Sequence, residues 1–155
     1  MRKPLVVTAS LLMVACAFGV VYAHGESKDL PEGPIRNRHD LMEGIGKNAK
    51  IIGDALKAGD LSPVAGAAAK IQASAAKITA LFPPGSTDPK SRAKPEIWTN
   101  WPKFEDTAKQ LEAKAGALAA AAKSGGDVGA ASKEMFGTCK SCHDDFRVPE
   151  KKKES

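Results

Sequence analysis

The chain has 155 residues, enough for one domain, with 23 Lys and Arg against 18 Asp and Glu and a net charge of +5. This mild charge argues against nucleic acid as a partner, which requires a concentrated basic face, and the cluster 151–153 is expected to be a solvated tail. Only 5% of the residues are aromatic, whereas alanine is abundant between 65 and 122, which favours helices.

Residues 1–23 have the features of a secretory signal peptide. A positive start precedes an apolar run, Leu5–Val21, and the small Ala23 follows as a cleavage position. The run is short for a membrane span, so a permanent anchor is the less favoured alternative. Cys16 raises the alternative of a lipoprotein, but it is expected to leave with the signal. We therefore expect a periplasmic mature domain, 24–155, that does not span the membrane.

Four segments of the mature chain have apolar residues spaced by three and four positions, which indicates amphipathic helices. The spacing predicts helices at about 34–57, 62–82, 102–123 and 127–146.

Residues that favour helix ends support these boundaries. Pro34 suits a first helical position and Gly59 a C-terminal stop. Ser62 is expected to cap the second helix, with Pro63 at its first position. Gly125, followed by a second glycine, separates the last two helices.

The connection 83–100 is long, polar and rich in proline, whereas the other two links are short. The sequence shows neither a strand pattern nor a repeat of fixed period. These features together predict an all-α fold, an antiparallel four-helix bundle.

The sequence Cys139-Lys140-Ser141-Cys142-His143 is a C-x-x-C-H motif, typical of covalent haem c attachment. On a helix, positions i and i+3 share a face, so both sulfurs can meet the two vinyl groups at one porphyrin edge. His143, four residues after Cys139, can then place its imidazole under the iron as the proximal ligand. A helical bundle with few bulky core residues also has room for such a group.

Other interpretations of the two cysteines are a structural disulfide, a thioredoxin-like redox pair and half of a zinc site. The redox pair requires a βαβ setting, which the pattern lacks. A zinc site requires a second pair of ligands, which the mature sequence does not supply. Covalent attachment of one haem c is therefore the favoured interpretation.

The chain resembles the class II c-type cytochromes, the family of cytochrome c′ and its low-spin, methionine-ligated relatives. The resemblance covers nearly all of 34–148 and rests on the C-terminal position of the haem motif and on four further segments. They are Phe146-Arg147 after the motif, Leu81-Phe82-Pro83 and Lys94-Pro95-Glu96-Ile97-Trp98 around the long connection, and Arg38-x-x-x-Met42 in the first helix. The family's fold is an antiparallel four-helix bundle around the haem, which agrees with the helix pattern.

The group opposite His143 decides the function. Met135 lies on the same helix as Cys139 and is expected to pack beside it. Met42 lies on the inward stripe of the first helix, which is free to cover the other haem face. The resemblance favours a Met42 sulfur–iron bond; the alternative is a Met42 that only lines an open pocket. His39, one turn earlier, is the rival ligand.

With Met42 bound, the iron is saturated, and we expect a one-electron carrier with His/Met ligation. With an open position, the protein is instead a five-coordinate, cytochrome c′-like binder or scavenger of nitric oxide or carbon monoxide. No acid–base cluster accompanies the motif, so an enzyme is not expected. Expected partners are redox proteins of unknown identity, and the family resemblance implies a monomer or homodimer.

Overall fold

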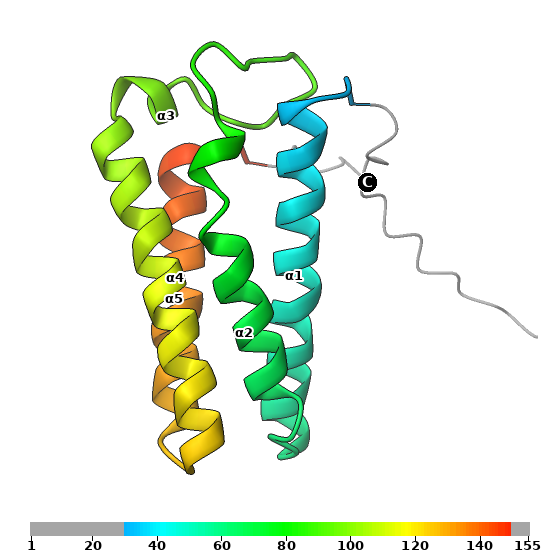
Figure 1. Cartoon of the computed structure of the whole chain (residues 1–155), viewed down its shortest axis with the longest axis vertical. Helices are drawn as coiled ribbons and strands as arrows, with labels where there is room; N and C mark the ends of the chain where they lie inside the picture. Colours follow the sequence, from blue (N-terminus) through cyan, green and yellow to red (C-terminus); the bar gives the residue numbers. More distant parts are fainter. Residues whose placement is uncertain (1–29, 150–155) are drawn as a thin grey trace, which may run out of the picture.

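The computed structural model describes residues 30–149, so the expected signal peptide and the basic tail lie outside the described part. Four long helices form an antiparallel bundle (Figure 1). They are α1 (Pro34–Ala58), α2 (Val64–Ala75), α4 (Trp101–Ser124) and α5 (Val128–Phe146). Within 30–149 there is no strand, only an isolated bridge between Ala93 and Arg147. The predicted all-α four-helix bundle is confirmed.

Glycine, proline and aspartate set the helix ends much as the sequence predicts. Gly59 and Gly125 follow α1 and α4 in the left-handed conformation, each with φ of 73°, which residues with a Cβ rarely adopt. Asp127 caps α5, because its carboxylate accepts a hydrogen bond of 2.8 Å from the N–H of Ala130.

The second predicted helix, 62–82, is too long at both ends. Ser62 does not cap it: α2 begins at Val64, and the Ser62 N–H instead bonds the Asp60 carboxylate. After Ala75 the backbone hydrogen bonds span three residues instead of the four of an α-helix, and the chain passes through the short 3₁₀ helix η2 (Thr79–Leu81). The two prolines that follow exclude an α conformation at the residue before each, and the tighter turn still buries the apolar side chains there.

Small side chains hold the centre of the bundle together. The pair α2 and α4 makes the most extensive contact, and the buried alanines of both helices let their backbones approach closely. Helix α5 packs mainly against α4, and α1 mainly against α2, whereas α1 and α5 touch each other only sparsely. The bundle is therefore weakly closed between α1 and α5.

Larger side chains gather at the end of the bundle where α1 begins and α5 ends. The ring of Phe104 lies 4.9 Å from Phe82 and 5.3 Å from Phe146, both edge to face. The short α3 (Glu96–Thr99) is fixed there by the indole of Trp98, which donates to the carbonyl of Phe82 at 3.2 Å. Within 30–149 no helix is long and apolar enough to cross a membrane.

Arg38 joins α1 to the long connection at this same end. Its side chain is 4% exposed, and its guanidinium donates to the Ser86 carbonyl at 2.8 Å and to the hydroxyls of Ser86 and Ser91 at 2.9 and 2.8 Å. The guanidinium carbon also lies 4.8 Å from the centre of the Phe82 ring. Arg38 is thus the buried link between the first helix and the connection 83–95.

Replacing Arg38 by methionine should lower the free energy of unfolding by about 2–4 kcal/mol, because it removes the charge-assisted hydrogen bonds of a buried guanidinium to a partly buried carbonyl and two hydroxyls. Arg36→Met is the matched control: Arg36 pairs with the exposed Glu32 and also donates to the Leu30 carbonyl just before the helix, so its loss should cost only about 1 kcal/mol. Urea unfolding of both variants measures the difference. Equal losses would contradict the structural role assigned to Arg38.

Candidate functional site

The two cysteines and the histidine of the motif lie in the last two turns of α5. Cys139 and Cys142 are half-buried free thiols that pack against the core, and His143 is exposed. Because the three residues are spaced i, i+3 and i+4, α5 presents them on one side. The structure therefore brings together the three residues that the motif predicts for haem attachment.

The surroundings of the two thiols do not suit redox chemistry. Burial raises the pKa of Cys139, and burial together with the charges of Cys139 and Asp145 raises the pKa of Cys142 to about 11. Redox-active pairs need a lowered thiol pKa, because the thiolate is the reactive form. The surroundings of both cysteines thus disfavour a redox-active pair.

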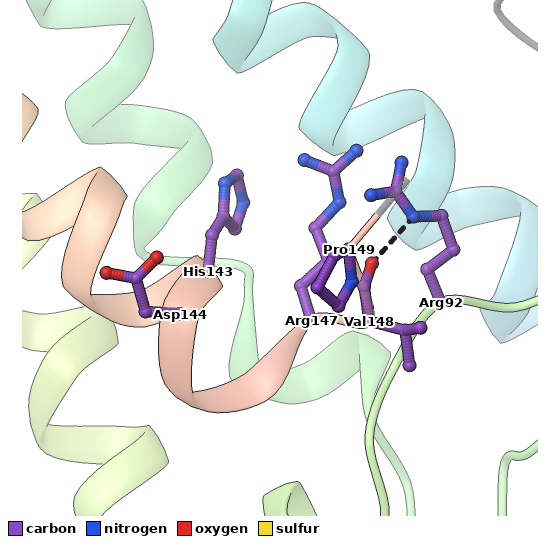
Figure 2. A pocket seen from close by; sticks show the side chains of 6 residues that line it. All are labelled: Arg92, His143, Asp144, Arg147, Val148 and Pro149. Atoms are coloured by element: carbon purple, nitrogen blue, oxygen red, sulfur yellow. Dashed lines mark hydrogen bonds between the residues drawn. The ribbon is translucent and has the colours of Figure 1, made fainter. Parts of the chain in front are cut away.

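A pocket of ≈ 270 Å³ opens beside His143. Its lining consists of Arg92, His143, Asp144, Arg147, Val148 and Pro149. Figure 2 shows the imidazole of His143 and the guanidinium groups of Arg147 and Arg92 projecting to one side, while the Asp144 carboxylate points away from them. The pocket therefore combines a ring nitrogen donor with positive charge.

The electrostatics favour a neutral imidazole at His143. Although His143 lies at the surface, the protein around its ring removes part of its hydration and lowers the pKa of His143. The positive charges of Arg147 and Arg92 lower this pKa further, and only Asp144 acts in the opposite direction. A neutral imidazole is the form that binds a metal. The same two arginines supply positive charge for carboxylate groups such as the haem propionates.

Apolar side chains on the facing helices also fit a flat apolar group. Leu41, Met42 and Ala49 of α1 and Phe136 of α5 pack against the core but are only partly buried. Since α1 and α5 touch sparsely, an inserted group could complete the burial of these residues without displacing an existing helix contact. The residues present therefore fit a haem c held by α5.

The two methionines differ in burial. Met135 of α5 is fully buried in the core, in agreement with the packing role predicted for it. Met42 lies on α1, one turn after the buried Arg38, and remains partly accessible.

His39 lies one helical turn before Met42, and its neighbours are polar. Its side chain is 35% exposed, and Nδ1 lies 3.6 Å from the carboxylate of Asp40. The carboxylate of Glu43, one turn on, is close to both groups. Glu43 is itself paired with Lys47 at 2.8 Å, which lowers the pKa of Glu43. His39 thus sits in a small polar cluster on the surface of α1.

The sequence did not reveal the role of the two pocket arginines. Arg147 follows His143 by four positions, and this helical spacing was a signal that could have placed both side chains on one side. Arg92 comes from the long connection, where no periodic pattern exists, so its arrival at the pocket depends on the tertiary fold.

Comparison with known proteins agrees with this site. The family model described as Cytochrome C′ matches residues 33–147. The cytochrome c′ of Rhodopseudomonas palustris is 35% identical over 118 residues, covering 74% of this chain and 81% of the relative. That of Pararhodospirillum photometricum is 33% identical over 123 residues, covering 76% of this chain and 98% of the relative.

The fold comparison points to the same group of proteins. The crystal structure of cytochrome c′ from Thermochromatium tepidum superimposes with a TM-score of 0.70 at 31% identity, covering 75% of this chain and 95% of that structure. The motif, the helical bundle and these matches lead to one assignment. The chain belongs to the cytochrome c′ family, and its cofactor is one covalently bound haem c.

Proposed function

We propose that Cys139 and Cys142 hold the haem through two thioether bonds and that His143 is the proximal iron ligand. The observation that carries this proposal is the placement of all three residues on one side of α5, next to a pocket with two arginines. When bound, the haem supplies a redox-active iron and a position for a small ligand.

The chain's own residues then have separate tasks. His143 offers a neutral ring nitrogen, since burial and the two arginines lower its pKa. Arg92 and Arg147, which line the pocket beside His143, would balance the negative charge of the haem propionates. Helix α1, with Met42 and Leu41, is the element available to cover the opposite face and to exclude water from it.

We propose that the position opposite His143 is open and that Met42 forms part of the pocket wall. The function is then reversible binding of a small uncharged gas, with nitric oxide and carbon monoxide as candidates. Family membership supports this choice, because cytochromes c′ are typically high-spin and five-coordinate. We assign no catalytic residue.

The second candidate is a one-electron carrier with His143 and Met42 as axial ligands, the function favoured by the sequence. The position of Met42 supports it, because Met42 packs against the core but is only partly buried, whereas Met135 is fully buried in the core. An iron bound on both sides exchanges electrons with little rearrangement. We also propose export to the periplasm, based on residues 1–23, and redox proteins as partners.

Removing both thiols should abolish covalent attachment. The double variant Cys139→Ala/Cys142→Ala should lose all haem on denaturing gels, while each single variant should retain a reduced amount, because each sulfur forms one bond. Peroxidase staining of the gels measures the bound haem, and Ser141→Ala, which keeps both thiols, is the control. A double variant that stains like the wild type would contradict the attachment site.

The spin state separates the two candidate functions. An open position predicts a high-spin iron in the ferric and ferrous protein and ready carbon monoxide binding, with Met42→Ala leaving the spin state unchanged. Optical and spin-resonance spectra, followed by carbon monoxide addition, provide the measurement.

A Met42–iron bond gives the opposite pattern in the same experiment. The wild type would be low-spin and slow to bind carbon monoxide, and Met42→Ala would become high-spin and reactive. His39→Ala is the control for the rival ligand: a change of spin state in this variant alone would place the bond one helical turn earlier.

A further inference from the structure

The connection between η2 and α3 is hydrogen-bonded to both α1 and α5. We call its residues 86–94 the strap; they cross the end of the bundle where α1 begins and α5 ends (Figure 1). From α1, Arg38 donates to Ser86 and Ser91, as described above. The strap is therefore attached to the helix that carries Met42.

The other end of the strap pairs with the chain that follows α5. The N–H of Lys94 donates to the Phe146 carbonyl at 3.0 Å, and the N–H of Val148 donates to the Arg92 carbonyl at 2.8 Å. The Nε–H of Arg92 also donates a hydrogen bond to the Val148 carbonyl at 2.9 Å (Figure 2). These bonds surround the isolated bridge between Ala93 and Arg147 and hold the strap against the residues that follow α5, the helix that carries His143.

Two carbonyls of the last turn of α5 lack their usual helical donors, one because of this pairing and one because of a proline. The N–H that would bond Asp144 belongs to Val148, which is bonded to the strap instead. The N–H that would bond Asp145 is missing, because residue 149 is proline.

The Lys94 side chain supplies the missing donors. Its Nζ lies 2.8 Å from the Asp144 carbonyl and 3.2 Å from the Asp145 carbonyl. An ammonium group at the C-terminus of a helix also opposes the negative end of the helix dipole. The two residues whose carbonyls Lys94 holds, Asp144 and Asp145, directly follow His143.

We propose that Lys94 is a positioning residue for His143. By closing the last turn of α5, Lys94 fixes the backbone that orients the imidazole, and the strap ties this turn to α1. Because α1 and α5 touch sparsely, the strap adds a hydrogen-bonded connection between these helices. The inference rests on the proposed role of His143 as the iron ligand.

The test compares the holoprotein with its Lys94→Met variant, which keeps an apolar stem and removes the ammonium. Two readouts are needed: the paramagnetic NMR shifts of the His143 ring protons, and the hydrogen exchange of the Arg147 amide, which bonds the His143 carbonyl at 3.1 Å. We expect the ring-proton shifts to move and the amide to exchange roughly tenfold faster, as for the loss of a charged donor.

Two further variants complete the design. Lys94→Arg, which can donate to both carbonyls, should restore the wild-type shifts. Lys70→Met removes the same charge from an exposed position on α2 and should change neither readout. A Lys94→Met protein with a lower melting temperature but unchanged ring-proton shifts would overturn the positioning role, since Lys94 would then only stabilise the fold.

The wild-type spectrum separates this inference from the function on which it rests. If the wild-type holoprotein shows no paramagnetically shifted His143 ring protons, His143 is not the iron ligand, and both proposals fail. If the wild type shows them and Lys94→Met leaves them unchanged, only the positioning role of Lys94 fails.

Discussion

The pitch of α5 is the constraint on which the site depends. A helix repeats its faces every three to four residues, so Cys139, Cys142 and His143 can serve one porphyrin only while this segment remains helical to its last turn. The turn is close to the end of the element, where helices fray and carbonyls lack partners. The aromatic contact of Phe146 and the bonds from the strap hold it in place.

The second feature of the molecule is the weak closure between α1 and α5. Alanine-rich surfaces let α2 and α4 pack closely, and this pair forms the centre of the bundle. The outer helices α1 and α5 are each attached to one member of this centre and hardly to each other. Their partly buried apolar side chains would gain stability from a large apolar group, because burial contributes about 25 cal/mol per Å².

The charges around the C-x-x-C-H motif also suit a haem. Partial burial and the charges of Arg147 and Arg92 lower the pKa of His143, and burial raises the pKa of both thiols. A redox-active pair would require the opposite shift of the thiol pKa values. The C-x-x-C-H motif alone allowed several chemistries; its surroundings in the fold favour haem attachment.

Local patterns predicted most of the fold, because apolar spacing, glycine stops and the prolines are local signals. The predicted end of the second helix was wrong, because the backbone tightens before Phe82. This tightening depends on the prolines that follow and on tertiary packing. The pocket role of Arg92 and the capping by Lys94 depend on a connection that reaches α5 across about 50 residues, as the bonds from Lys94 to Asp144 and Asp145 show. No periodicity in the sequence encodes such a contact.

Mass spectrometry of a digest of the matured protein tests the central claim, that Cys139 and Cys142 carry the haem, most directly. The account predicts a peptide, or a pair of peptides joined by the haem, that contains both cysteines and His143 and is heavier than its sequence by one haem. Recovery of both cysteines as unmodified thiols from correctly matured protein would contradict it.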